Sequence, residues 1–483
     1  MFWRCLGLVI GIYCLVAHSC AIGQESNLSP TGLFHRCYGQ LVRARVPAND
    51  SRLAAIEDGS LDPVDACIRL LEDAAFSDLK PVENPSEEVR SVLRTMHDFH
   101  ASWFFDQSYE GNLFSGCEIQ AIENLIDPTA PAAYITRALF NPMARYEDVM
   151  RTPLTYRPVR STTSPTVSAR LKQPKVPYLY DDENGETQSW EVPYAPQGEL
   201  IGVEPNGSLI LPRSARTYHD GVANHDLYKN FGSGAIGDPA YMLMTIRDQV
   251  DGFRAQGALE MPRRWSRSLL KDFLCRDLPV IRRGDGIAFA RVEAQAPFRR
   301  SNSCIQCHAS MDRLAATNRN ILYSKASNRA CDASTPILRF MFPQPVTLPA
   351  KEVWPIANDY EYSKRPPEGV LYYRSYNGQL VHRKVLGVSG AANAIADNED
   401  YYVCAAKRYY EFFTGIKADL RDIGDPLEPI FLNKEQLDAR KTVVDLGLNL
   451  KQHQSLKSLV RQILSSANYR KVYFGHGGKD EEN

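Results

Sequence analysis

The 483-residue chain lacks the features that define several common classes of protein. Its 56 lysines and arginines balance 57 aspartates and glutamates, so no basic surplus points to nucleic acid. No run beyond the N-terminal leader is apolar enough to span a membrane, and no internal repeat is visible. No Gly-rich phosphate loop, HExxH or Ser/His/Asp arrangement occurs. What is present is a length with room for about two to four domains.

One pentapeptide carries a specific chemistry. Cys304-Ile305-Gln306-Cys307-His308 is a CxxCH sequence, the attachment site of a c-type haem. Each thiol can bond one haem side group, and the histidine can then bind the iron. The sequence therefore predicts one covalent haem c, with Cys304 and Cys307 as attachment residues and His308 as an axial ligand.

A zinc site is the competing interpretation of these cysteines. It would need two further ligands, and His308 directly follows Cys307, so the two side chains cannot easily close one tetrahedron. Haem is therefore favoured.

The N-terminus predicts export. Arg4 precedes an apolar run, Cys5 to Val16, which is too short to cross a bilayer comfortably and is flanked like a signal peptide. Small residues before the bond after Gly23 suit cleavage there, which gives a signal peptide over residues 1–23 and Gln24 as the mature N-terminus. We expect a periplasmic or cell-envelope protein.

An alternative leader keeps the protein on a membrane. Ala17-His18-Ser19-Cys20 resembles a weak lipoprotein box, in which Cys20 would be lipidated. Ala17 in place of the usual leucine, and the bulky His18, favour the soluble form.

The cysteine count agrees with export. Apart from the leader and the CxxCH, six cysteines are left, an even number that suits disulfides in an oxidising compartment. Only a Cys37–Cys67 pair is suggested by position, since both residues lie on candidate helices of one segment; buried free thiols are the alternative. The six are Cys37, Cys67, Cys117, Cys275, Cys331 and Cys404.

Hydrophobic periodicity predicts a mainly α protein with small β insertions, and the CxxCH sequence predicts that it contains a single c-type haem domain. Residues 24–152 predict an N-terminal helical domain, in which Asp62 and Pro63 form a strong helix start. Prolines, tyrosines and turn residues over 153–219 predict a β-rich insertion, with hairpins around 181–185 and 205–207.

The second half predicts helices around the haem and a helical C-terminus. Residues 220–332 form the expected haem c-binding domain, and 333–474 a domain with a hairpin at Asn377-Gly378 and two helices. The last helix has apolar residues at i, i+3, i+4, i+7 and i+8 from Leu456. The polar residues 475–483 predict a disordered tail.

The order of several short motifs resembles a known family, the exported bacterial proteins with a planctomycete-type cytochrome c domain, in which consecutive domains of unknown function surround one CxxCH. The resemblance implies an exported haem protein and names no substrate. Where the family often has Pro-Leu-Gly after the aspartate matching Asp312, this chain has Arg313-Leu314-Ala315. The matching stretches are Ala144 to Met150, Phe231 to Leu243, Leu274 to Pro279, Cys304 to Asp312, Tyr402 to Gly415 and Ile463 to Arg470.

The sixth ligand of the iron is the open position. Met341 leads, because it lies downstream at a distance typical of His/Met cytochromes and near Pro343; a core methionine between aromatics is the alternative. Met311 follows His308 by three residues and is expected to pack on the proximal side. Met242, Met244 and Met261 stay open as ligands, whereas His382 and His453 have polar neighbours and are expected at the surface.

Two arginines precede the motif. Arg299 and Arg300 are candidates to pair with the haem propionates, because a guanidinium fork suits a carboxylate. A solvent-exposed role is the alternative.

Three functions stay open. The sequence favours a non-catalytic electron-transfer protein, or a redox subunit of a cell-envelope complex, with an unknown redox partner protein. A haem enzyme, peroxidase or oxygenase, with an open distal site is the second, although bacterial peroxidases usually carry two haems. The third is a binding or sensing protein with a structural haem.

Overall fold

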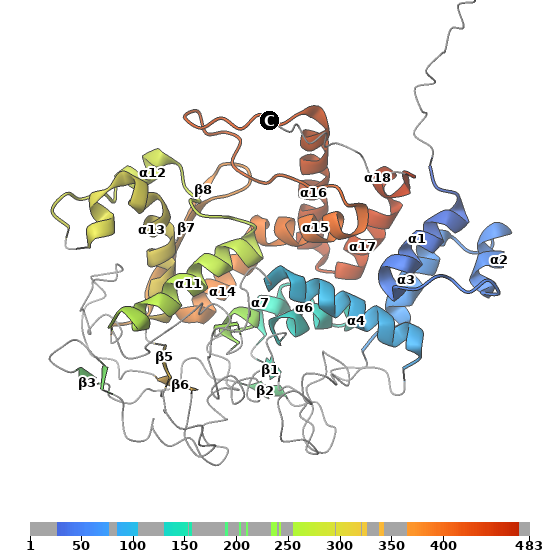
Figure 1. The fold of residues 1–483 in the computed structure, drawn as a ribbon, viewed down its shortest axis with the longest axis horizontal. Helices are drawn as coiled ribbons and strands as arrows, with labels where there is room; N and C mark the ends of the chain where they lie inside the picture. Colours follow the sequence, from blue (N-terminus) through green and yellow to red (C-terminus); the bar gives the residue numbers. More distant parts are fainter. Residues whose placement is uncertain are drawn as a thin grey trace, which may run out of the picture.

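The structure is a computed structural model, and the residues it describes are mostly helical. Helices account for most of these residues, and the strands form two-stranded pairs (Figure 1). The predicted mainly α fold with small β elements is therefore confirmed. The predicted signal peptide and C-terminal tail lie outside the described residues, which are 27–76, 85–104, 130–152, 154–156, 189–191, 202–203, 209–210, 233–238, 241–242, 255–294, 296–319, 321–325, 338–341 and 365–472.

The N-terminal segment is helical, as predicted. The Asp62 side chain accepts hydrogen bonds from the amides of Val64 and Asp65, with Pro63 in the first turn, so the expected helix start is confirmed. Helix α1 packs on α3 and on α4, and α4 packs on α6. The helices are α1 (Pro30–Val42), α2 (Ser51–Glu57), α3 (Pro63–Asp73), α4 (Glu87–Ala101), η1 (Ser102–Phe104), α6 (Ala130–Phe140) and α7 (Asp148–Arg151).

The strands form antiparallel pairs. The hairpin expected at 205–207 corresponds to β3 and β4, and that at Asn377-Gly378 to β7 and β8, where Gly378 adopts a φ of 77°. Trp190 pairs with Thr155, and the turn expected at 181–185 lies outside the described residues. The pairs are β1 (Leu154–Tyr156) with β2 (Ser189–Glu191), β3 (Gly202–Val203) with β4 (Leu209–Ile210), β5 (Leu322–Lys325) with β6 (Leu338–Met341), and β7 (Glu368–Arg374) with β8 (Leu380–Leu386).

The CxxCH sequence lies on α13. This helix packs against α11, α12 and β7, so three elements of different parts of the chain surround it. Figure 1 shows α12 and α13 at one end of the molecule and α1 to α3 at the other. The elements of this segment are η3 (Ala235–Gly237), α11 (Ala255–Leu274), α12 (Arg283–Ile287), η4 (Pro297–Arg300), α13 (Asn302–Ala315) and η5 (Ala316–Asn318).

The C-terminal segment has more helices than the two expected. The apolar stripe from Leu456 is confirmed as α17. Most residues of helix α15 are buried, so the helix has no continuous polar face. Without such a face its sequence does not show the amphipathic pattern by which a helix is predicted. The helices are α14 (Gly387–Ala396), α15 (Glu399–Thr414), α16 (Lys434–His453), α17 (Leu456–Ser465) and α18 (Ala467–Arg470).

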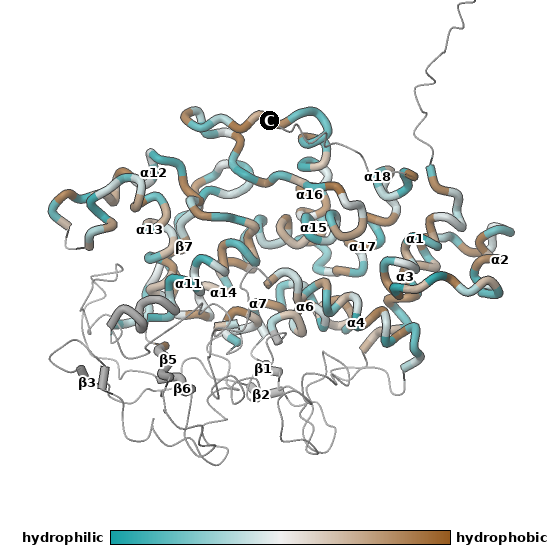
Figure 2. Tube along the Cα trace, in the orientation of Figure 1, coloured by the Kyte–Doolittle hydropathy of each residue, from teal (hydrophilic) through white to brown (hydrophobic). Residues whose placement is uncertain are grey.

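Buried apolar residues from Leu33 to Tyr469 belong to one hydrophobic cluster. Hydrophobic and hydrophilic residues are interspersed along the helices that supply it (Figure 2). The two ends of the described chain meet, since the Leu28 amide donates to the Arg470 carbonyl at 2.7 Å. The domain boundaries expected from composition stay predictions. Among the described residues, no helix is both long and apolar enough to cross a membrane.

Candidate functional site

Helix α13 places the three residues of the motif on one face. Cys304, Cys307 and His308 stand at i, i+3 and i+4, and residues at this spacing are neighbours on a helix surface. Cys304 is exposed, Cys307 is half-buried, and neither forms a disulfide. Burial raises the pKa of the Cys307 thiol, partly offset by the nearby Arg267 cation. The site therefore presents two thiols and an imidazole on one face of the helix.

One nitrogen of His308 is already in use. Its Nδ1 lies 2.9 Å from Oδ2 of Asp312, one turn further along α13. Asp312 is fully buried, and a carboxylate can only accept, so Nδ1 donates this hydrogen bond. In the neutral imidazole the lone pair then lies on Nε2. The ring of Phe298 stacks on the imidazole, with centroids 4.2 Å apart and planes 19° apart. The imidazole is thereby fixed in both tautomer and plane.

A second charged residue holds Asp312. Arg263 of α11 donates from Nε to Oδ1 at 2.8 Å and from an Nη to Oδ2 at 3.0 Å. The same guanidinium lies over the Phe298 ring, 5.0 Å from its centroid. Ser266, one turn on, donates to the main-chain oxygen of Met311. Helix α11 thus fixes the carboxylate that orients His308.

The two arginines expected at the haem propionates lie in η4, just before α13. Arg299 donates from Nε to the Phe289 carbonyl at 3.3 Å, and Arg300 from Nε to the Ala294 carbonyl at 2.8 Å. Arg300 is exposed. These bonds tie η4 to the preceding loop, and pairing with propionates stays a prediction.

Met341 lies at the end of β6, opposite Leu322 of β5. Its side chain lies outside the described residues, so its role as axial ligand stays a prediction. Met311 is half-buried on α13, and Met242 is fully buried. The side chains of Met244 and Met261 also lie outside the described residues.

Both histidines expected at the surface are exposed. Nε2 of His382 accepts a hydrogen bond from an Nη of the buried Arg313 at 3.2 Å. His453 lies at the end of α16. The Arg313 guanidinium lies close to the rings of both Phe289 and Tyr372, 4.6 and 4.7 Å from their centroids. Because Tyr372 belongs to β7, the contact between Arg313 and Tyr372 holds α13 against β7.

Sequence reasoning missed three residues of the site, Asp312, Arg263 and Phe298. The spacing of four between His308 and Asp312 was a usable signal, because it predicts a contact on any helix. Nothing local indicates Arg263, which precedes Asp312 by 49 residues, or the stacking of Phe298.

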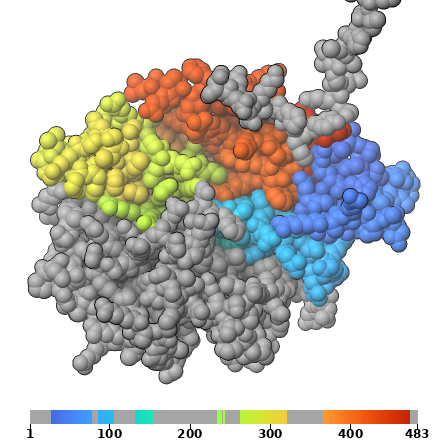
Figure 3. Space-filling model, viewed as in Figure 1, coloured from blue at the N-terminus to red at the C-terminus, as the bar shows by residue number. Residues whose placement is uncertain are grey.

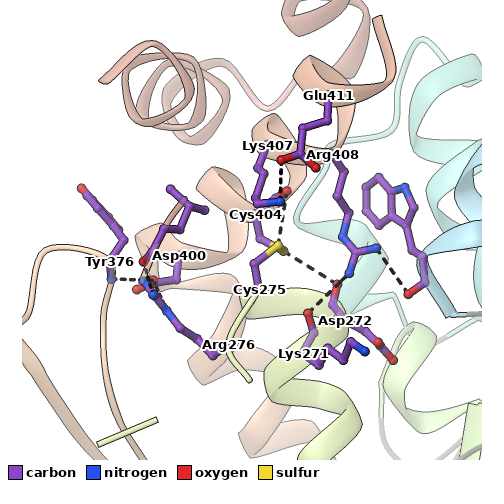
Figure 4. The surroundings of a disulfide bond; sticks show 12 residues. Lys271, Asp272, Cys275, Arg276, Tyr376, Asp400, Cys404, Lys407, Arg408 and Glu411 are labelled. Atoms are coloured by element: carbon purple, nitrogen blue, oxygen red, sulfur yellow. Dashed lines mark hydrogen bonds and ion pairs between the residues drawn. A yellow bond between two sulfur atoms is a disulfide. The ribbon is translucent and has the colours of Figure 1, made fainter. Parts of the chain in front are cut away.

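The structure contains two disulfides in its described residues. The suggested Cys37–Cys67 pair is confirmed, and Cys275 of the loop after α11 pairs with Cys404 of α15. Cys117 and Cys331 lie outside the described residues. Beside the second disulfide, the half-buried Arg408 donates to the carbonyl of Asp272 at the end of α11 (Figure 4). Burial raises the pKa of Asp272 to about 7.

No three His, Cys, Asp or Glu side chains in the described part of the chain are grouped to hold a metal ion. The ligand set of a zinc site is therefore not found around Cys304 and Cys307 within these residues. Comparisons of the chain with protein-family models, curated proteins and solved structures gave no match. The function has to be argued from the site itself.

Proposed function

We propose that this protein is an exported mono-haem c-type cytochrome that transfers electrons, alone or as a redox subunit of a cell-envelope complex. The observation that carries the proposal is the α13 face, on which two unpaired thiols stand beside an imidazole whose Nε2 is available to a metal. The resemblance to proteins with a planctomycete-type cytochrome c domain supports the same function. Membrane attachment would require lipidation of Cys20.

The residues present fit a haem c. Cys304 and Cys307 would each add sulfur and hydrogen across one vinyl group, and His308 would bind the iron through Nε2. Metal-bound histidines usually donate their other N–H to a carboxylate or a carbonyl, as His308 does to Asp312. The haem would supply one-electron chemistry. Phe298 covers one face of the imidazole and limits its rotation.

The position of the site suits exchange of electrons with a partner. Cys304 is exposed, and Figure 3 shows the α12–α13 segment, in yellow, at the surface of one end of the molecule. Electron transfer needs close approach of the cofactor to a partner, and it does not require a substrate pocket. The single CxxCH favours a carrier over a two-haem peroxidase.

The test is to produce the chain together with haem-maturation factors and to record ferric and ferrous spectra with and without carbon monoxide. We expect the haem to stay bound to the protein through acid denaturation and organic extraction. We also expect a low-spin spectrum that does not change when carbon monoxide is added. The double substitution Cys304→Ala with Cys307→Ala should abolish this retention. Haem lost from the wild type on extraction would contradict the proposal. Ready binding of carbon monoxide would contradict electron transfer and favour a haem enzyme or a sensor.

Met341 is proposed as the sixth ligand. Met341→Ala should remove the low-spin ferric spectrum and admit carbon monoxide to the ferrous iron. Met143→Ala is the matched control, since Met143 is 86 % exposed and far in sequence from the motif. An unchanged spectrum in Met341→Ala would exclude this ligand and leave the attachment residues unaffected.

A further inference from the structure

The geometry points to Asp312 and Arg263 as positioning residues that set the reduction potential of the haem in opposite directions. This inference rests on the proposed attachment of haem at Cys304, Cys307 and His308. Asp312 and Arg263 lie outside the CxxCH sequence and would act on the haem through His308.

The first observation is the environment of Asp312. Its side chain has no exposed surface, and its two oxygens receive three hydrogen bonds, one from His308 and two from Arg263. A charge in such a place is weakly screened by solvent, so it acts strongly on its neighbours. Asp312 is therefore a buried, hydrogen-bonded part of the site and not a surface carboxylate.

The effect of the carboxylate follows from its contact with His308. An anionic acceptor on Nδ1–H draws the proton away from the ring and makes Nε2 a stronger electron donor to a bound metal. A stronger donor stabilises the ferric state, which carries one more positive charge than the ferrous state. Asp312 therefore lowers the reduction potential.

The effect of Arg263 has the opposite sign. Its side chain is 26 % exposed, and its guanidinium compensates the charge of Asp312 through two hydrogen bonds. With this cation removed, the carboxylate would act on His308 at full strength. Arg263 therefore raises the potential relative to an uncompensated Asp312.

The experiment is a spectroelectrochemical titration of the mature haem protein and its variants. Asp312→Asn keeps the shape of the side chain and should raise the midpoint potential, whereas Arg263→Gln should lower it. A purely structural role would disturb both variants in the same sense. Arg263→Lys keeps the charge and should shift the potential less than Arg263→Gln.

Arg94→Gln is the control, because Arg94 is an exposed arginine on α4, a helix that packs on α1, α3 and α6 and not on α13. Its shift should be smaller than that of Arg263→Gln, since solvent screens an exposed charge. An unchanged potential in Asp312→Asn, or shifts of the same sign in Asp312→Asn and Arg263→Gln, would overturn the inference.

A measurement without haem separates this inference from the proposed function. In the reduced, haem-free protein, ¹⁵N NMR should show His308 with a proton on Nδ1. Asp312→Ala, which removes the acceptor, should lose that preference, and Asp312→Asn, whose amide oxygen can still accept, should only weaken it. A proton on Nε2 in the wild type would overturn the inference. Failure of covalent attachment in the presence of maturation factors would instead overturn the proposed function, and attached haem with unshifted potentials would overturn the inference alone.

Discussion

Asp400 joins three segments through one buried carboxylate. It lies in the first turn of α15, is 1 % exposed, and forms an ion pair with buried Arg276. The same side chain accepts from the Tyr376 amide at 2.8 Å (Figure 4). It also accepts from the Tyr373 hydroxyl at 3.2 Å. Arg276 also donates to the Leu420 carbonyl. The chain after α11, strand β7 and α15 therefore share one charged centre.

Asp400→Asn should be strongly destabilising, because it leaves the charge of Arg276 buried without compensation. Breaking a buried pair in this way costs on the order of 3–5 kcal/mol. Urea unfolding followed by circular dichroism measures the change. Arg461→Gln is the control, since its pair with Asp65 is exposed at both partners, and such pairs contribute less than about 1 kcal/mol. Equal losses in the two variants would contradict the argument.

Helices α15 and α16 approach each other closely at a glycine. A Cβ built on Gly447 of α16 would lie 2.5 Å from the Cα of Val403, inside any normal contact. Two of the three nearest atoms, the Cα and the amide nitrogen of Val403, belong to the backbone of α15, so they cannot move away without shifting the helix. The close crossing of these helices therefore depends on the missing side chain.

Gly447→Ala should destabilise the protein even though alanine is the better helix former by roughly 1 kcal/mol. The overlap with Val403 should exceed this gain, and we expect a net loss of about 1–3 kcal/mol, typical of overpacking. Gly39→Ala is the matched control, because the Gly39 Cβ would meet nothing closer than 3.9 Å in α1. It should gain stability. Thermal unfolding of both variants distinguishes the two signs.

The disulfides link helices over very different lengths of chain. Cys37–Cys67 closes 30 residues, whereas Cys275–Cys404 closes 129 and joins the end of α11 to α15. A longer loop loses more entropy when it is closed in the unfolded chain, by about 1 kcal/mol for this pair of lengths. The second disulfide should therefore contribute more to stability.

Replacing Cys275 and Cys404 together by alanine should cost about 2–5 kcal/mol, and more than the same replacement at Cys37 and Cys67. Both variants lose two buried or partly buried sulfur atoms, so each serves as the control for the other. Urea denaturation gives the two free energies of unfolding. A larger loss at Cys37 and Cys67 would show that local packing outweighs loop closure.

Two buried histidines connect elements from both halves of the molecule. Nδ1 of His100 on α4 lies 2.8 Å from the Thr136 hydroxyl on α6, and its Nε2 lies 2.6 Å from the Tyr409 hydroxyl on α15. Nδ1 of His97 also contacts Thr136. Burial lowers the pKa of His97 to about 3, and burial with repulsion from His97 places the pKa of His100 well below its ordinary value. Both are neutral in the folded protein.

The lowered pKa values predict loss of stability in mild acid. Below the ordinary pKa near 6.5 the unfolded chain protonates His97 and the folded protein does not, so stability falls from about pH 6.5 toward pH 3. Between pH 7 and pH 5 the loss is at most about 2 kcal/mol for this histidine. Asp272 acts in the opposite sense, since its raised pKa favours folding as the pH falls.

Comparison with a variant isolates the histidine. Between pH 7 and pH 5, the difference in unfolding free energy between the wild type and His97→Asn should change by up to about 2 kcal/mol. His453→Asn, at an exposed position, should show no such change. Parallel pH profiles for the wild type and His97→Asn would refute the buried-histidine argument.

The predictable part of the fold consists of local features. The Asp62 cap, the Asn377-Gly378 hairpin and the stripe from Leu456 each depend on residues within a few positions of one another, and the structure confirms all three. The two-helix expectation for the C-terminus was wrong, because burial of α15 on most sides hides its periodicity. The Cys37–Cys67 pair was predictable because both cysteines lie in one helical segment.

The sequence by itself determined that Cys304, Cys307 and His308 lie on one helix face, since they need only one turn of helix to stand together. Only the tertiary structure decided which distant residues reach this helix. Arg263 reaches Asp312 because α11 packs on α13, and Cys275 reaches Cys404 because α11 packs on α15. Such contacts join residues 49 and 129 positions apart, and no local pattern specifies which distant helix will fill a given buried face.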